Sequence, residues 1–399
     1  MRSSKFLSGM VFFCVLCTVI SVNVAASDTS ALWDRIYRDA ATESQRYDVM
    51  LKMVDVNDPD ISAVLQTALS SLYARRIENG SVADQRTKIN LAELIISRLG
   101  TLTAPDSKVL LMRIYNEAKD PYLKGESAQA LGKMGAAEYA EFFARDLADL
   151  NLKPDVGDTH SQEVKAAYLV AALAFLKAPV GLEPVFSASI GWYSPASKVK
   201  EQARTAFTVM SDNPIPFLQG VIEKPTTVTT KLRAIEAAAN SAGAPALKAS
   251  LARAALGQGL MIKGNDLLNS TDLAALRIKA LRMLVAAADA DATSVPLIGN
   301  SIKFLGASVE EVLLGYEALG KNTSSASVAF LVAQLTEYHR RQKEGVKNTD
   351  DERRFIRAII ADFALQKPSA AKAVLTEVQF SNHDAQITRE AKDVADQLK

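Results

Sequence analysis

The sequence predicts an all-α protein, an α-solenoid of about nine helix pairs, and three observations lead to this fold class. Apolar residues recur at helical spacing, as in Phe355, Ile356, Ile359, Ile360 and Phe363, and not in the alternation of a half-buried strand. A small residue followed by a larger apolar one returns in the middle of successive helical patterns. A proline follows most of these pairs after a short interval.

The pair of a small and a larger residue marks the repeat. Its second members stand 31 to 44 residues apart, the range that two helices and their turns occupy. The pairs are Met50-Leu51, Leu94-Ile95, Ala130-Leu131, Ala172-Leu173, Ala206-Phe207, Ala237-Ala238, Ala280-Leu281, Ala318-Leu319 and Ala358-Ile359. The first two are weaker copies; the other seven begin with alanine, which lets two helix backbones approach while the larger neighbour fills the space between them.

Seven of the nine pairs are followed by a proline within six to fifteen residues. Because proline cannot continue a helix but suits the first turn of the next one, each predicts the end of one helix and the start of another. The prolines are Pro59, Pro105, Pro179, Pro216, Pro245, Pro296 and Pro368. Longer joins rich in Gly, Asn, Asp or Lys are expected as surface loops at 152–162, 257–272 and 340–351.

Two helices per unit and an irregular period resemble the HEAT-repeat family. The likeness is carried best by Asp120-Pro121, which opens a helix, and by "ALGKMG" at 130–135, and it extends over most of residues 42–398. Tetratricopeptide repeats are the nearest alternative, but they hold a 34-residue period with Trp, Leu-Gly and Tyr at fixed places, which this chain does not. The resemblance implies a HEAT-like helical repeat domain over residues 27–399.

Residues 1–26 have the features of a secretory signal peptide. Arg2 and Lys5 precede an apolar run over residues 10–20, and small residues lead to a cleavage site after Ala26. The alternative is an uncleaved anchor, but the run is short for a membrane span of about 20 residues. We therefore expect a periplasmic or secreted protein with no membrane span after cleavage.

The composition of the mature chain limits which metal sites, disulfides and partners can be expected. Both cysteines, Cys14 and Cys17, lie in the leader, so no disulfide and no Cys-ligated metal is expected. Without Arg2 and Lys5 the 46 basic residues become 44, against 45 acidic ones. A net charge near −1 gives no reason to expect nucleic acid as a partner.

Residues able to carry catalysis or bind metal are few. His160, His339 and His383 have no second histidine at ligand spacing, and each is expected to be a solvated loop or helix-end residue. The acidic stretches at 55–60 and 349–355 match metal-binding loops only in part and are better explained as helix N-termini. We expect no catalytic residue, no cofactor and no metal site, and hence no enzyme.

Basic pairs recur on the first helices of successive units and predict either a stripe across the repeats or, more simply, solvated faces balanced by nearby acids. The pairs are Lys198/Lys200, Lys231/Arg233, Arg277/Lys279 and Arg353/Arg354. A second candidate surface is Trp192 and Tyr193, held outside regular helix by Gly191 and Ser194-Pro195. Either these aromatic residues anchor an interface, or Trp192 fills the space between adjacent repeats as a wedge.

The function expected is that of a non-enzymatic, exported protein–protein interaction scaffold of the cell envelope. Stacked helix pairs form an extended face on which another protein of the envelope or extracellular space can bind. One alternative is an all-α toroid-like enzyme acting on carbohydrate, which requires paired carboxylates and stacking aromatics, whereas aromatic residues make up only 7% of the chain. Another is a cofactor- or pigment-handling HEAT-like protein, a cytoplasmic role that conflicts with the export signal.

Overall fold

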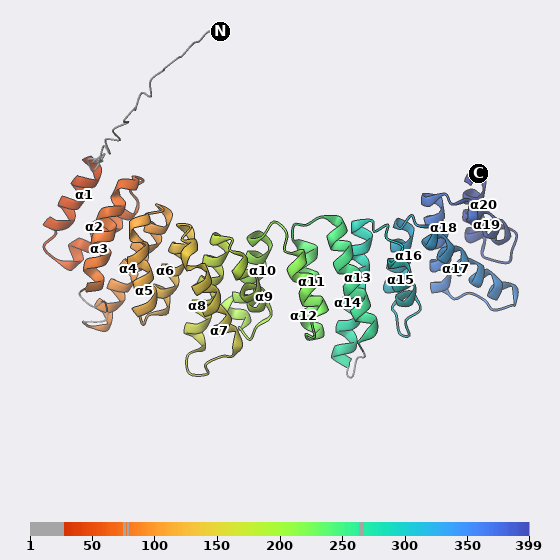
Figure 1. Cartoon of the computed structure of the whole chain (residues 1–399), viewed down its shortest axis with the longest axis horizontal. Helices are drawn as coiled ribbons and strands as arrows, with labels where there is room; N and C mark the ends of the chain where they lie inside the picture. The colour runs from red at the N-terminus through yellow and green to blue at the C-terminus, as the bar shows by residue number, and fades with distance from the viewer. Residues whose placement is uncertain (1–27, 75–76, 78–79, 263–266, 399) are drawn as a thin grey trace, which may run out of the picture. The chain divides into compact units, whose positions relative to one another are not determined.

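A computed structural model describes residues 28–74, 77, 80–262 and 267–398, and every regular element in these ranges is a helix (Figure 1). The predicted signal peptide lies outside the described residues. The first ten α-helices are α1 Asp28–Asp39, α2 Glu43–Val54, α3 Ser62–Ala74, α4 Val82–Thr101, α5 Lys108–Glu117, α6 Pro121–Lys133, α7 Ala140–Leu152, α8 Thr159–Leu176, α9 Leu182–Ile190 and α10 Val199–Met210. The rest are α11 Ile215–Glu223, α12 Val228–Asn240, α13 Pro245–Met261, α14 Leu267–Ala287, α15 Ser294–Ile302, α16 Val309–Lys321, α17 Ser325–Lys343, α18 Asp350–Gln366, α19 Lys372–Gln379 and α20 Ala385–Gln397.

The helices form two compact units, which divide within α4: one reaches Ile95 and the other comprises residues 96–399. In the first unit α1 packs on α2 and α3, and its core contains Met50, Met53 and Leu65. In the second unit most helices pack on a neighbour in sequence and on the helix two further along. This is the packing of an α-solenoid, so the predicted fold class is confirmed.

The second unit consists of two rows of helices. Helices α6, α8, α10, α12, α14, α16, α18 and α20 contact one another in series and form the even row. The odd-numbered helices cover the opposite side, with α11, α13, α15, α17 and α19 also in serial contact. All nine predicted residue pairs lie on even-numbered helices, from α2 to α18, so the estimate of nine units omitted the pair that ends with α20.

The second member of the residue pair is buried in every even-numbered helix from α4 to α18. These residues are Ile95, Leu131, Leu173, Phe207, Ala238, Leu281, Leu319 and Ile359. The prediction is wrong for α2, where Leu51 is 37% exposed and the preceding Met50 is fully buried. Methionine is large enough to fill the core position itself, so the register there shifts by one residue.

Small residues bring helix backbones into contact at two crossings of the second unit. A Cβ added to Gly132 would lie 2.8 Å from the Cα of Ala172, so α6 and α8 touch at this point. A Cβ added to Gly100 would lie equally close, at 2.8 Å, to the Cα of Ala130. Since both alanines are first members of the repeated pair, close approach is their physical role at these crossings.

The seven prolines lie at the caps or first turns of odd-numbered helices or of the 3₁₀ turns that precede them, as expected. The predicted loop at 257–272 is wrong in extent, because α13 continues to Met261 and α14 begins at Leu267. Gly259 lies inside α13, where a Cβ would be 2.7 Å from Cγ of Arg277, so glycine here makes room for this side chain.

Arg277 is the centre of a buried polar network that joins four helices. Its Nε and Nη2 donate to the two carboxylate oxygens of Glu311 in α16, at 2.6 and 3.0 Å, and its Nη1 donates to the carbonyl oxygen of Gly259 in α13 at 3.3 Å. Ser301 in α15 donates to the same carboxylate at 2.6 Å, and the guanidinium lies 4.0 Å from the ring centroid of Phe304. Because every charged atom of the pair has a partner, the cost of burying it is offset.

Two histidines expected to be solvated and alone are instead buried against each other. Nδ1 of His339, in α17, lies 3.4 Å from Nε2 of His383, which precedes α20, and the rings stack at 5.6 Å. Asn348 approaches the other ring nitrogen of His383 at 3.4 Å. Burial lowers the pKa of both imidazoles; Lys343 lowers that of His339 further, and His339 lowers that of His383. The prediction missed this cluster because its members are 44 residues apart and no local pattern connects them.

Asp362 in α18 is a second buried titratable group. Its carboxyl lies against Gly320 of α16, where any Cβ would collide with it, and its Oδ2 has no hydrogen-bond partner among the described residues. Burial, reinforced by the nearby Glu317, raises the pKa of Asp362 to about 8. The carboxyl is therefore protonated in the folded protein at neutral pH.

We expect Leu281→Ala to destabilise the second unit by about 2–5 kcal/mol, because it leaves a cavity at a fully buried side chain. Since repeats are held mainly by their neighbours, the urea unfolding curve, followed by circular dichroism, should broaden or split. The control is Leu305→Ala, at a leucine that is 96% exposed. A single sharp transition at the wild-type midpoint would show that residue 281 is not a core anchor.

Asp362→Asn should change how stability depends on pH. In the wild-type protein the folded state retains a proton that the unfolded state loses above its ordinary pKa of 3.8, so stability falls as pH rises from about 4 to about 8. The slope can reach about 1.4 kcal/mol per pH unit, and the variant should lack this part of it. Urea unfolding at pH 5, 6, 7 and 8 measures both slopes, with the exposed Asp396→Asn as control. Parallel wild-type and variant profiles would contradict the assignment.

Candidate functional site

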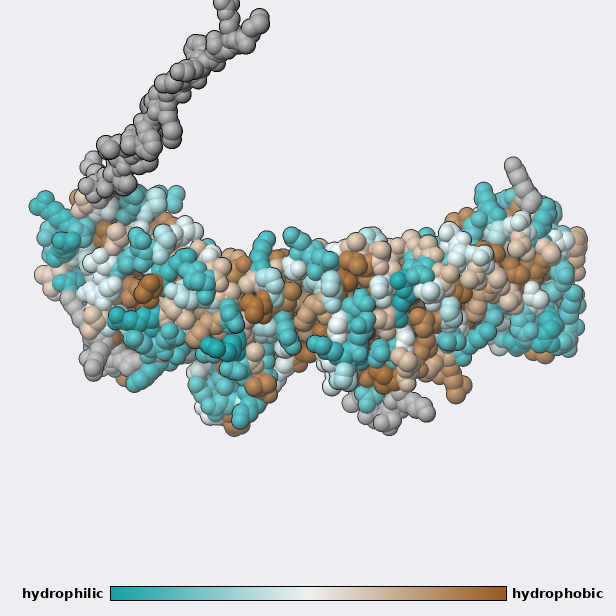
Figure 2. Space-filling view, in the orientation of Figure 1, coloured by the Kyte–Doolittle hydropathy of each residue, from teal (hydrophilic) through white to brown (hydrophobic). Residues whose placement is uncertain are grey.

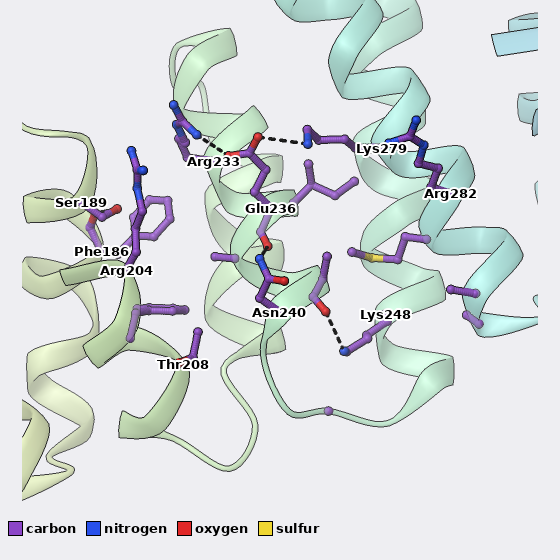
Figure 3. Close-up of a pocket in the computed structure, with 18 of the residues that line it drawn as sticks. Phe186, Ser189, Arg204, Thr208, Arg233, Glu236, Asn240, Lys248, Lys279 and Arg282 are labelled. Carbon is purple, nitrogen blue, oxygen red and sulfur yellow. Dashed lines mark hydrogen bonds and ion pairs between the residues drawn. The ribbon is translucent and has the colours of Figure 1, made fainter. Parts of the chain in front are cut away.

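The even row carries a groove between α10 and α14, which we call the α10–α14 groove (Figure 3). It is lined by residues of α9, α10, α12, α14 and the start of α13, and its volume is about 800 Å³. Pockets that bind small molecules or side chains usually measure roughly 300–1,000 Å³. The groove is therefore large enough to hold several side chains of a ligand.

The floor of the groove is apolar and follows from the sequence of α9 and α10. Phe186 and Phe207 lie with ring centroids 5.7 Å apart, and both pack on Phe217 of α11 at 5.8 and 6.0 Å. On the other side Met283 of α14 completes the floor. Helices α10 and α12 make few direct contacts compared with α6 and α8, and the groove lies where the contact within the even row is weak.

Five cationic side chains and one carboxylate line the groove: Arg204, Arg233, Lys248, Lys279, Arg282 and Glu236. Glu236 projects from α12 and bridges two of the cations, Nη1 of Arg233 at 2.5 Å and Nζ of Lys279 at 3.1 Å (Figure 3). Burial acts to raise the pKa of Glu236, but the hydrogen bonds from Arg233 and Lys279 outweigh it and hold the pKa below its usual value. This triad is part of the rim and retains one net positive charge.

The other three cations lack a carboxylate inside the groove. Arg204 is exposed on α10, with no hydrogen bond or ion pair to any residue that the structure describes. Nζ of Lys248 contacts the carbonyl oxygen of Ala239 at 3.4 Å. Arg282 pairs with Glu310, which is not a lining residue, and both side chains are exposed, so this pair is weak. The groove therefore has an excess of positive charge.

The predicted basic pairs divide between the core and this groove. Lys231 is buried and donates to the carbonyl oxygens of Ile222 and Lys224, while Arg277 is buried on Glu311. Their partners two residues on, Arg233 and Lys279, face the groove because residues i and i+2 point to different sides of a helix. A stripe made of both members of each pair is thus wrong for α12 and α14.

A second hollow lies on the same row, beside α6 and α8, with a volume of about 710 Å³. Tyr168 donates to Oε1 of Glu126 at 3.0 Å, and Glu163 accepts from the backbone amide of Ser194 at 2.6 Å. Burial raises the pKa of Glu126. His160 is exposed here, as predicted, with its Nε2 3.3 Å from the hydroxyl of Tyr122.

Trp192 and Tyr193 lie between α9 and α10 and are both tied to the end of α7. The indole N–H of Trp192 donates to the carbonyl oxygen of Leu150 at 2.9 Å, and the hydroxyl of Tyr193 donates to Oδ1 of Asn151 at 2.8 Å. Tyr193 is only 1% exposed, whereas Trp192 is half-buried. An interface role for Trp192 stays a prediction.

The described residues contain no cluster of three or more His, Asp or Glu side chains placed to hold a metal ion. In the same part of the chain no helix combines the length and hydropathy of a membrane span. Hydrophilic and hydrophobic side chains are intermixed over the visible face of the described residues of the second unit (Figure 2).

Tyr193→Phe tests the structural role of this residue. Loss of the hydroxyl leaves Oδ1 of Asn151 without its donor, and we expect a cost of about 1 kcal/mol in the free energy of unfolding. Tyr122→Phe is the matched control, because the Tyr122 hydroxyl is exposed and contacts only an exposed imidazole. Equal stabilities of the two variants in urea unfolding would speak against a buried hydrogen bond at Tyr193.

Comparisons with known proteins give little further information. No model of a known protein family matches the chain, and no curated protein matches it. Among solved structures, human deoxyhypusine hydroxylase in complex with glycerol aligns with 85% of this chain and 96% of its own length, at 14% sequence identity. The TM-score of this alignment is 0.26, too low to support an argument about fold or function.

Proposed function

We propose that this chain is an exported, non-enzymatic scaffold of the cell envelope, built on HEAT-like repeats, that binds another protein on its even row. The observation that carries the proposal is the α10–α14 groove, in which cations without carboxylate partners surround an apolar floor. Apolar area together with placed polar groups is typical of a protein-binding site.

The packing of the second unit supports a binding role. Five helices contribute to the groove, and each is held by neighbours on both sides, so the lining side chains start from a fixed framework. Preorganised side chains lose less conformational entropy when a partner binds. The solenoid thus provides a surface whose geometry exists before the partner arrives.

The chemistry of the groove favours binding over catalysis. Its carboxylate, Glu236, is held by two cations with a lowered pKa, which makes it a poor proton acceptor. The carbohydrate-enzyme alternative would place its chemistry in the hollow beside α6 and α8, where Glu126 has a raised pKa. There the second carboxylate, Glu163, is already bonded to a backbone amide, which favours the scaffold.

Site-specific photo-crosslinking tests this function. The full chain is expressed in its native host with a photo-reactive amino acid at Thr208, in the groove, or at Val109, exposed on α5 of the odd row. We expect an adduct of defined mass from Thr208 in the envelope or secreted fraction, little adduct from Val109, and a chain that begins at Ser27. Equal labelling from the two positions, or a cytoplasmic chain that retains residues 1–26, would contradict the proposal.

A further inference from the structure

We propose that the α10–α14 groove binds an acidic peptide segment of its partner, one that carries an apolar side chain between carboxylates. This inference rests on the proposed function and adds the chemistry of the partner.

The free cations lie on both sides of α12. Arg204 comes from α10 on one side, and Lys248 comes from α13 on the other (Figure 3). Arg282 of α14 lies on the same side as Lys248 but is paired with Glu310. Between them Glu236 is already neutralised by Arg233 and Lys279, so it repels an incoming anion only weakly. A ligand with negative charges at both ends and none in the middle matches this arrangement.

The cation types suit carboxylates. The guanidinium of Arg204 can bind a carboxylate through two parallel hydrogen bonds, and the ammonium of Lys248 can donate in any direction. Since Arg204 has no partner in the described part of the chain and Lys248 has only a long bond to a carbonyl oxygen, neither must give up an ion pair to bind. Two sites for acidic side chains are therefore ready on opposite sides of the groove.

The apolar floor selects a peptide over a purely anionic ligand. Phe186, Phe207 and Met283 are themselves buried, and the apolar surface left open to a ligand comes from Ala239, Pro245 and Ala286. A leucine or phenylalanine of the ligand would remove this surface and its own from water. A sugar acid or a phosphate offers no such side chain. The floor thus adds a hydrophobic requirement to the requirement for negative charge.

On α12 and α14 two further cations do not add to the surface charge. Lys231 and Arg277 are buried on carbonyl oxygens and on Glu311, so Arg233, Lys279 and Arg282 are the basic side chains that these two helices present. A nucleic acid needs cations in a continuous track along its phosphates. A short acidic segment needs only those of the groove, so it is the ligand that the arrangement fits.

Fluorescence anisotropy with three dye-labelled peptides of ten residues tests the proposal on the mature chain, residues 27–399. The first has Asp and Glu on both sides of a central Leu-Phe, the second has Ser-Ser at the centre, and the third has Gln for each acid. We expect the first to bind at least about tenfold more tightly than either of the others, and its affinity to fall as salt increases.

Paired variants identify the site. Arg204→Ala/Lys248→Ala should weaken binding of the first peptide by about tenfold or more, and Arg204→Glu further. The control Arg389→Ala/Lys392→Ala removes the same two residue types from exposed positions of α20 and should bind like wild type. Because Arg204 and Lys248 make no strong contact, circular dichroism should show both double variants fully folded.

The remaining outcomes overturn the inference. Equal affinities for the three peptides, wild-type affinity of Arg204→Ala/Lys248→Ala, or tighter binding of oligogalacturonate would each exclude an acidic apolar segment as the preferred ligand. A dimer in sedimentation that Arg204→Ala/Lys248→Ala dissociates would make a second copy of the chain the occupant. A photo-adduct at Thr208 without peptide binding would support the scaffold function and reject the acidic peptide as its ligand. Peptide binding without the adduct would support the acidic peptide as a ligand and reject the scaffold function.

Discussion

The contact between helix backbones at small residues is the constraint on which the second unit depends. Where glycine faces alanine, as at Gly132 and Ala172, two helices of the even row touch and their side chains interlock around the contact. Between α10 and α12 the contact is weaker than between α6 and α8, and Phe186, Phe207 and Phe217 pack together beside it. The α10–α14 groove lies at this weaker contact. The same repeat therefore builds both the continuous row and its interruption.

Buried charges determine which side chains reach the surface of the row. Arg277 points into the core because Glu311, Ser301 and the carbonyl of Gly259 satisfy it there. Because Arg277 points inward, Lys279, two residues further along α14, points outward. In α12 the inward Lys231 leaves Arg233 pointing outward for the same reason. Both outward cations then meet on Glu236. The polar core of α12 and α14 is thus also the support of the groove's rim.

The sequence predicted the repeat well because its signal is local. Helical spacing, a small residue beside a large one and a proline before the next helix all lie within one unit, and they located each even-numbered helix from α2 to α18. Register failed only at Leu51, where two large residues, Met50 and Leu51, competed for one core position. The site was harder to predict. The basic pairs were visible, but whether Lys231 or Arg233 is buried depends on carbonyl oxygens of the preceding turn. The stacking of His339 on His383 depends on residues 44 positions away.

The buried ionisable groups of α16 to α20 make the stability of this end of the solenoid depend on pH. Protonation of His339 or His383 places a charge among buried groups, so acid below the ordinary imidazole range works against this packing. Asp362 has the opposite sign, because it loses its proton and becomes a buried anion as the medium turns alkaline. The loss of stability from histidine protonation at low pH and the loss from Asp362 ionisation at high pH are together smallest at a mildly acidic pH. The last helices of the solenoid are therefore most stable in a mildly acidic medium.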